Sequence, residues 1–151
     1  MIKISSSMFN FLKKNISLKT EDLELKDRDG RTVFINAVVE GDNKKVKILI
    51  EKNIDLNVQD KNGFSALHFA AQEYQLDIVN LLLEEKVLVD LQDKHGNTPL
   101  NNAVFYSRGR GEIIRSLLRN GADRNIKNNS GVSPLDLANT ISNYDIKQFF
   151  I

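Results

Sequence analysis

Apolar positions recur along this chain with a period of 33 residues. Ala37, Ala70 and Ala103 keep that spacing, as do Leu49 and Leu82. The same period holds for turn-forming residues, which are Asp27, Asp60 and Asp93 and also Gly30, Gly63 and Gly96. Because self-similarity at a fixed period of about 20 to 50 residues is typical of stacked repeat proteins, we expect several copies of one small unit.

The period changes once. Beyond residue 93 the spacing becomes 35 residues, for example from Pro99 to Pro134. A two-residue insertion explains the change, and it must lie between Ala103 and Leu117. The only abnormal stretch there is Ser-Arg-Gly-Arg-Gly at 107–111.

Each unit is predicted to contain a turn followed by two short helices. Asp-x-x-Gly sequences mark the turns. Thr32, Ser65, Thr98 and Ser133 provide a hydroxyl where the first helix of each unit begins, and Pro follows the last two of them. Gly121 and Asn53 are placed to end second helices in the left-handed conformation. The predicted first helices are 33–40, 66–73, 99–106 and 134–140, and the second helices are 43–52, 76–85, 112–119 and 143–150.

Length and composition narrow the class of protein without identifying it. The chain has 151 residues, of which 41% are hydrophobic and 27% charged, as expected of a single globular domain with a sizeable core. Since cysteine is absent, thiol catalysis, cysteine zinc sites and disulfides are excluded, and a reducing compartment such as the cytoplasm fits. A net charge of +1 provides no overall field that would attract nucleic acid or an anionic membrane.

The third unit resembles the ankyrin repeat almost position for position. The matching residues are Asp93, Gly96, Thr98, Pro99, Leu100, Ala103, Leu117, Leu118, Gly121, Ala122, Asp123 and Asn125. The resemblance covers Asp27 to about Ala138 and implies an all-α solenoid of stacked helix-turn-helix units with turn or hairpin tips. Four residues depart from the family pattern: Val33 and Phe34 in place of Pro and Leu, Lys45 at a usually apolar site, and Leu88 where Asp is usual.

The whole chain is therefore expected to form one repeat domain with a cap at each end. The predicted bounds are 1–26 for the N-terminal cap, 27–59, 60–92 and 93–127 for three repeats, and 128–151 for a truncated capping repeat. In the N-terminal cap, Met8, Phe9, Leu12 and Ile16 share one helical face. Two interpretations of that face are open, a first element of the stack or an amphipathic targeting helix. The segment has no continuous apolar run that would form a signal peptide or a membrane span.

Residues that carry catalysis are scarce. The chain has two histidines and no His pair at helical metal spacing, Ser/His/Asp arrangement or phosphate-binding loop. His68 stands at the family's Thr-Pro-Leu-His position, where the resemblance implies a structural role in hydrogen bonding the turns of its own and neighbouring repeats. We therefore expect no enzyme activity, no catalytic residue, no metal and no cofactor.

The resemblance implies that partners dock on the concave face, which the turn tips and first helices build. Large aromatic residues at Phe64, Phe105 and Tyr106 are the candidate anchors, because an exposed aromatic ring is worth about 2 kcal/mol or more in an interface. The alternative is that Phe105 or Tyr106 folds back over the next repeat. The predicted partner-binding residues are Arg31, Phe64, Gln72, Glu73, Lys94, His95, Asn97, Phe105, Tyr106, Arg108 and Arg110.

Arg108 and Arg110 lie in the insertion and allow two interpretations. A lengthened turn between helices would expose both side chains without a further role. An electrostatic contact with a protein partner is the other possibility, and a single Arg-Gly-Arg-Gly copy without aromatic residues makes RNA binding the weaker choice.

Charge is unevenly distributed along the chain. Residues 1–53 carry 11 basic and 8 acidic groups, residues 54–93 carry 2 and 8, and residues 94–151 carry 8 and 4. A solenoid keeps sequence order in space, so a partner could use this basic, acidic, basic pattern for register. Alternatively, Asp77, Glu84 and Glu85 of a second helix form part of a solvated outer face.

These observations predict a non-enzymatic, monomeric protein of the cytoplasm that acts by binding another protein and not nucleic acid or membrane. The resemblance extends to short bacterial ankyrin proteins, among them inhibitors and immunity partners of toxins. An adaptor or effector that engages a host or regulatory protein is the alternative. Nucleic-acid binding and self-association are the weaker hypotheses.

Overall fold

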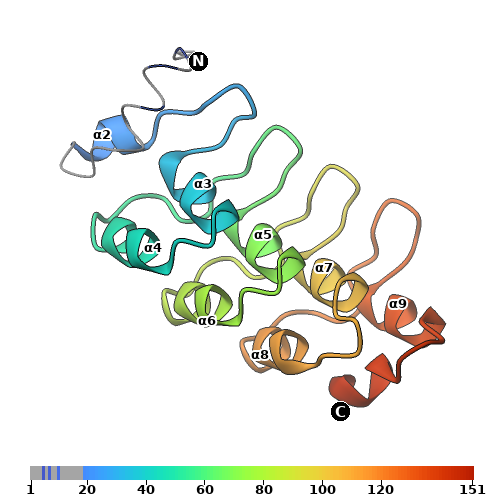
Figure 1. Cartoon of the computed structure of the whole chain (residues 1–151). Helices are drawn as coiled ribbons and strands as arrows, with labels where there is room; N and C mark the ends of the chain where they lie inside the picture. Colours follow the sequence, from blue (N-terminus) through green and yellow to red (C-terminus); the bar gives the residue numbers. More distant parts are fainter. Residues whose placement is uncertain (1–4, 6, 8–9, 11–18) are drawn as a thin grey trace.

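The helices of this protein stack in two rows, as the computed structural model shows (Figure 1). The structure describes residues 5, 7, 10 and 19–151. The predicted apolar face of the N-terminal cap, from Met8 to Ile16, lies outside the described residues. In Figure 1 the first helices α3, α5, α7 and α9 form one row, and the second helices α4, α6 and α8 form the other. Loops project from the opposite side of the first-helix row.

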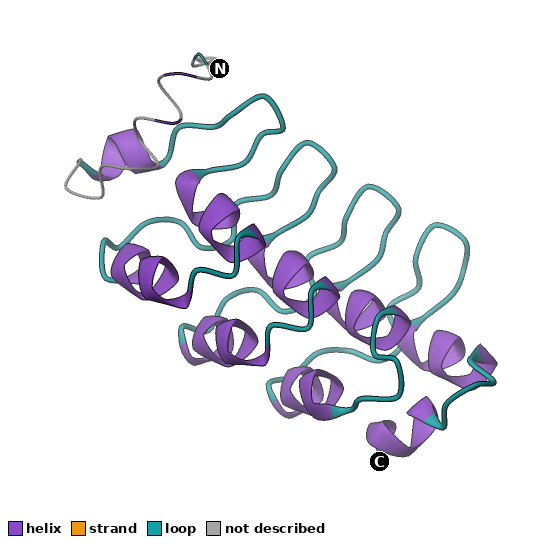
Figure 2. Cartoon of the chain, viewed as in Figure 1, coloured by secondary structure: helices purple, strands orange, loops and turns teal. Residues whose placement is uncertain are grey.

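Regular structure in residues 19–151 is helical, apart from one isolated bridge between Gln59 and Ser65 (Figure 2). This confirms the predicted all-α class. The described elements are α2 (Thr20–Leu23), α3 (Val33–Val39), α4 (Asn43–Ile50), α5 (Ala66–Gln72), α6 (Leu76–Glu84), α7 (Pro99–Phe105), α8 (Glu112–Arg119), α9 (Pro134–Thr140) and the 3-10 helix η1 (Ile146–Phe150).

The four first helices begin at the predicted capping residues. Thr32, Ser65, Thr98 and Ser133 are the N-caps of α3, α5, α7 and α9, all with extended backbone. Pro99 and Pro134 occupy the first helical position, where the missing N–H costs nothing. Several helices end one or two residues before the predicted position, and α8 and α9 have the predicted bounds.

Stacking of successive units buries a continuous core. Along the first-helix row α3 contacts α5, α5 contacts α7 and α7 contacts α9, while α4, α6 and α8 contact one another in order. The fully buried side chains include Phe34, Leu67 and Leu100 of first helices and Leu49, Leu82 and Leu117 of second helices. The apolar positions that share the repeat period are therefore those that neighbouring units bury between them.

Successive turns are built alike and bonded to one another. In the second turn the Asp60 Oδ1 atom accepts from the Asn62 and Phe64 N–H groups at 2.8 and 2.9 Å. Between turns, the Lys94 N–H donates to the Asn62 carbonyl at 2.8 Å. Gly63 has φ +79°, and a Cβ there would lie 2.8 Å from the Cα of Asp93 in the next turn, so this position needs glycine for two reasons.

The C-terminal segment closes the end of the stack but differs from the predicted helix at 143–150. The observed element is the shorter 3-10 helix η1, which lacks a side-chain hydrogen bond at its N-cap. It contacts both α8 and α9 and buries Ile146, Phe149 and Phe150. Because this short element directs three large side chains inward, packing determines its form more than helix propensity does.

The predicted insertion is accommodated in the connection between α7 and α8, through residues 107–111. Arg108 and Gly109 both have positive φ, at 50° and 86°. At Gly111 an added Cβ would collide with the ring of Phe149. The insertion therefore turns the chain sharply and passes close against the C-terminal segment.

Candidate functional site

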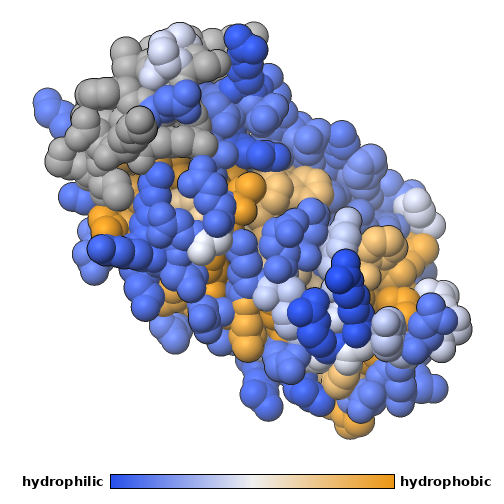
Figure 3. Space-filling view, in the orientation of Figure 1, coloured by the Kyte–Doolittle hydropathy of each residue, from blue (hydrophilic) through white to orange (hydrophobic). Residues whose placement is uncertain are grey.

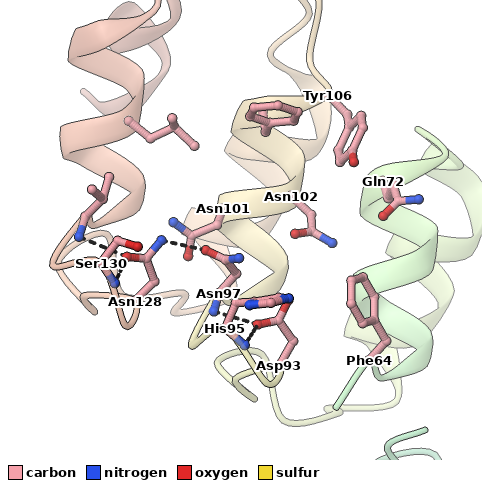
Figure 4. Close-up of a pocket in the computed structure, with 13 residues that line it drawn as sticks. Phe64, Gln72, Asp93, His95, Asn97, Asn101, Asn102, Tyr106, Asn128 and Ser130 are labelled. Carbon is pink, nitrogen blue, oxygen red and sulfur yellow. Dashed lines mark hydrogen bonds between the residues drawn. The ribbon is translucent and has the colours of Figure 1, made fainter. Parts of the chain in front are cut away.

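A groove of about 500 Å³ crosses the first-helix row near its C-terminal end (Figure 4). Its side chains come from α5, α7 and α9 and from the turns that precede them. Six predicted partner-binding residues line it, namely Phe64, Gln72, His95, Asn97, Phe105 and Tyr106. A hollow of this size lies within the range of about 300 to 1,000 Å³ that is usual for ligand sites.

The remaining lining residues were not among the predicted partner-binding residues. They are Asp93, Asn101, Asn102, Asn128, Ser130, Val132 and Leu137. The period contained a signal for several of them, because Asn101 follows the structural His68 by 33 residues and Asn128 follows the turn residue Asp93 by 35. Asn128 does what the turn aspartates do: its Oδ1 atom accepts from the Ser130 and Val132 N–H groups, both at 3.0 Å.

Phe105 and Tyr106 form an exposed aromatic pair at the edge of the groove. Their ring centroids are 5.0 Å apart at 75°, an edge-to-face arrangement that aromatic quadrupoles favour. Phe105 is 64% exposed and Tyr106 is 40% exposed. The two rings therefore pack on each other and do not fold back over the next repeat.

Phe64 is placed differently from the other two aromatic candidates. It is only partly exposed and its ring lies 5.4 Å from that of His68 and 5.2 Å from that of Phe69. Its inner side thus stabilises α5, and only the outer side faces the groove. We expected this ring to be exposed to solvent. That expectation is corrected, because the ring packs against α5, the helix that follows its turn.

Arg31, Glu73 and Lys94 lie outside the groove lining. The Arg31 guanidinium lies over the Phe69 ring, 4.8 Å from its centroid, and its Nε atom is 3.4 Å from an Asp60 carboxylate oxygen. Lys94 Nζ donates to Asn62 Oδ1 at 2.8 Å. Both cations thus connect adjacent repeats.

Arg108 and Arg110 are also separate from the groove. Arg108 is exposed at the tip of the insertion. The Arg110 guanidinium lies 3.5 Å from the centroid of the Tyr74 ring, and its Nε atom donates to the Ser107 carbonyl at 3.0 Å. Arg110 therefore holds the insertion against the preceding repeat, a contact that neither interpretation of the insertion predicts.

Tyr74 completes that attachment. Its hydroxyl donates to the carboxylate of Glu112, the first residue of α8. Burial and the bonded Glu112 carboxylate together raise the pKa of Tyr74 to about 12. The phenol thus stays protonated at neutral pH and remains a donor across the two repeats.

His68 joins two repeats from within the core. It is fully buried, its Nδ1 atom accepts from the Ser65 N–H at 3.1 Å, and its Nε2–H donates to the Asn97 carbonyl of the next turn at 3.0 Å. Burial lowers the pKa of His68, although the Asn97 carbonyl opposes the shift. The ring is thus neutral with its proton on Nε2, and the structural role implied for it is confirmed by these bonds.

Some classes of site are not found in the described part of the chain. Within residues 19–151 no three His, Asp or Glu side chains converge as metal ligands would. None of the described helices is both long and apolar enough to cross a membrane. The acidic residues Asp77 and Glu84 lie exposed on α6, away from the groove lining.

The surface around these elements mixes both kinds of side chain. In Figure 3 hydrophilic residues cover much of the visible face, and hydrophobic residues show between them. The exposed large apolar residues include Leu88 at 57% as well as the aromatic pair. Leu88, which departs from the family pattern, thus exposes an apolar group in the second repeat.

Comparison with known proteins gives one result. A family model described as ankyrin repeats (3 copies) matches residues 1–93 and 46–128. A search of curated proteins found none that matches the chain.

Proposed function

Because this chain belongs to the ankyrin repeat family, we propose that it binds a protein partner through its concave surface, at the groove between α5, α7 and α9, and thereby inhibits or sequesters that partner. Ankyrin repeats are generic protein-protein interaction modules, and the family is typically non-enzymatic. The specific face, the residues and the inhibitory outcome are our proposal.

The observation that carries the proposal is the exposed pair of Phe105 and Tyr106 beside a groove. Aromatic side chains next to a hollow are the usual centres of binding energy in protein interfaces, where a few residues each contribute about 2 kcal/mol or more. Rigid aromatic rings also lose little conformational entropy when they are buried. The pair already holds its edge-to-face geometry, so binding requires little further ordering.

We favour inhibition over bridging because of the number of docking surfaces. Bridging needs two separate docking surfaces. Among the described residues, the exposed aromatic pair of Phe105 and Tyr106 adjoins one groove. This arrangement supports one principal docking surface for a partner. We also propose that the protein is a cytoplasmic monomer that has no catalytic residue, cofactor or metal and does not bind nucleic acid.

Site-directed photo-crosslinking tests the proposed surface. We would place p-benzoylphenylalanine at Phe105 in one protein and at the exposed Arg119 of α8 in another, and expose both to extract of the source cells. Position 105 should give a specific adduct whose protein component is identified by mass spectrometry, and position 119 should not. Equal adducts at both positions, or an adduct at 119 alone, would refute the proposed surface.

A second measurement separates inhibition from an adaptor role. The crosslinked partner is purified, and its own activity is assayed with the intact chain and with a Phe105→Ala/Tyr106→Ala variant. Loss of partner activity with the intact chain but not with the variant supports inhibition. Unchanged activity in a stable complex would show that the protein is an adaptor.

A further inference from the structure

The groove combines amide side chains with a larger apolar surface and carries little charge. Its amide side chains are Gln72, Asn97, Asn101, Asn102 and Asn128. Asp93 is the one carboxylate in the lining, and its Oδ1 atom is already occupied by the His95 and Asn97 N–H groups at 2.8 and 2.9 Å. An anion in this groove would be repelled by Asp93, and a cation would lose its hydration to meet a carboxylate that already accepts two N–H bonds, so an uncharged group loses the least hydration free energy there.

Asn101 provides a hydrogen-bond donor that the protein itself does not use. The residue is 3% exposed, and its Nδ2 atom has no partner among the described residues. A buried amide donor without an acceptor costs about 1–3 kcal/mol. A ligand that brings an acceptor to this nitrogen regains that free energy.

The orientation of the Asn101 amide is determined by its other end. Its Oδ1 atom accepts from the Thr98 N–H at 2.9 Å and the Thr98 hydroxyl at 3.1 Å. A flipped amide would place its NH₂ against the Thr98 N–H, donor against donor. Nδ2 therefore points away from the α7 N-terminus, on the side of α7 that faces α9 (Figure 4).

Apolar side chains flank this donor. Val132 and Leu137 line the α9 side of the groove, and Phe105 and Tyr106 line its far edge. The chemistry of the groove is thus a row of amides with an apolar rim. That combination matches a peptide chain in extended form, whose backbone alternates donors and acceptors while its side chains alternate in direction.

From this chemistry we propose that the groove binds an extended, uncharged segment of the protein partner, with one backbone carbonyl of that segment accepting from Asn101 Nδ2 and an apolar side chain packed against Phe105 and Tyr106. This inference rests on the proposed function and names the part of the partner that is recognised. Solvent does not reach Nδ2 in the structure, so the carbonyl meets it only when the lining side chains move.

The chain itself offers two replacements that deny this donor to a ligand and keep the helix start: Asp has no donor, and the His Nε2–H is expected to face the Val132 carbonyl of the next turn, as His68 faces that of Asn97. His68 holds the equivalent position in α5, and Asp136 holds it in α9, where its carboxylate accepts from the Ser133 N–H at 3.0 Å. Asn101→His and Asn101→Asp should therefore both fold. The first is neutral and larger, while the second is isosteric and charged.

The probe is a phage-displayed library of random linear 12-residue peptides, selected on the intact chain and counter-selected on the Phe105→Ala/Tyr106→Ala variant. Enriched peptides are synthesised and titrated by fluorescence anisotropy. We expect peptides with an uncharged, apolar-containing centre, and an affinity about tenfold weaker for both Asn101 variants, as loss of one buried hydrogen bond implies. Arg119→Ala, on the exposed side of α8, is the matched control and should bind as the intact chain does.

Replacing single peptide bonds of a selected peptide by esters identifies the carbonyl directly. One ester position should weaken binding to the intact chain, because an ester carbonyl is a poorer acceptor, and the same ester should have no effect on Asn101→His. This coupling distinguishes a hydrogen bond from simple crowding by the larger side chain.

The inference is overturned if no peptide is enriched, if the enriched centres are charged, or if the Asn101 variants bind as tightly as the intact chain. A failed selection together with a partner crosslinked at position 105 would mean that the groove recognises a folded surface, so that the proposed function survives without this inference. Crosslinking confined to position 119 would refute both.

Discussion

His68 and Asn101 stand 33 residues apart at the same position of successive helices, and only His68 reaches the next turn. The His68 Nε2 atom bonds the Asn97 carbonyl at 3.0 Å, whereas Asn101 Nδ2 has no partner among the described residues. The shorter asparagine keeps the bond to its own N-cap and gives up the bond between repeats. The contact between α7 and α9 is thus less well connected than that between α5 and α7.

Asn101→His should therefore stabilise the protein. By the repeat register the new imidazole faces the Val132 carbonyl, which lies 35 residues beyond Asn97, and one net hydrogen bond contributes about 0.5–1.5 kcal/mol. Urea unfolding followed by circular dichroism measures the change. Asn101→Ala, which also loses the bond to Thr98, should lower stability instead. A destabilised Asn101→His protein would contradict this assignment.

The free energy of unfolding should fall as the pH is lowered below the usual pKa of a histidine side chain. Burial lowers the pKa of His68 in the folded protein, so the unfolded chain binds a proton first as the pH drops below its pKa of about 6.5. The contribution of neutral His68 is therefore present above about pH 6.5 and is lost as the pH falls toward the lower folded pKa. Midpoints of urea unfolding measured between pH 7.5 and 5 record this slope.

The control for that slope is His68→Asn, which places in α5 the residue that α7 already carries. It should be less stable at pH 7.5 and should show a shallower pH dependence, with His95 present in both proteins. Identical slopes in the two proteins would assign the acid sensitivity to other groups.

Gly111→Ala should destabilise the end of the stack by about 1–3 kcal/mol, the usual cost of overpacking. Gly111 has an ordinary backbone conformation with φ −114°, so the cost comes from collision of the new methyl group with the Phe149 ring. Thermal unfolding measures the loss.

Phe149→Ala provides the matched background for that prediction. In it Gly111→Ala should cost little, because the ring that causes the collision is gone. Gly121→Ala should still be destabilising, since Gly121 has φ +90° and no neighbouring atom within 4 Å, a case of backbone strain alone. An undiminished cost of Gly111→Ala without the ring would exclude the collision.

Phe105→Ala and Phe64→Ala should separate binding from stability. Phe105 is 64% exposed, so its loss should change the free energy of unfolding by less than about 0.5 kcal/mol. Phe64 packs on His68 and Phe69, so its truncation should cost about 1–2 kcal/mol. Equilibrium unfolding of both variants decides, and equal losses would contradict the different placements of the two rings.

Much of the fold could be read from residues close together in the sequence. Thr32, Ser65, Thr98 and Ser133 begin helices because a hydroxyl at the N-cap acts within three residues of itself. Gly121 and Asn53 adopt the predicted positive φ, at 90° and 52°, for an equally local reason. The C-terminal helix was predicted less well, because packing of Phe149 and Phe150 onto the stack decides its form. The repeat bounds at 27, 60, 93 and 128 stay a prediction.

The sequence by itself determined the period, the helix starts, the all-α class and the side of the repeat on which candidate side chains fall. The tertiary structure decided which of them meet. Phe105 and Tyr106 stay exposed at a groove, Phe64 packs partly against α5, and Arg110 contacts Tyr74 of the preceding repeat. The unused donor of Asn101 also appears only in three dimensions. A side chain's local preference depends on near neighbours, whereas its contacts depend on residues some 30 positions away that only stacking brings together.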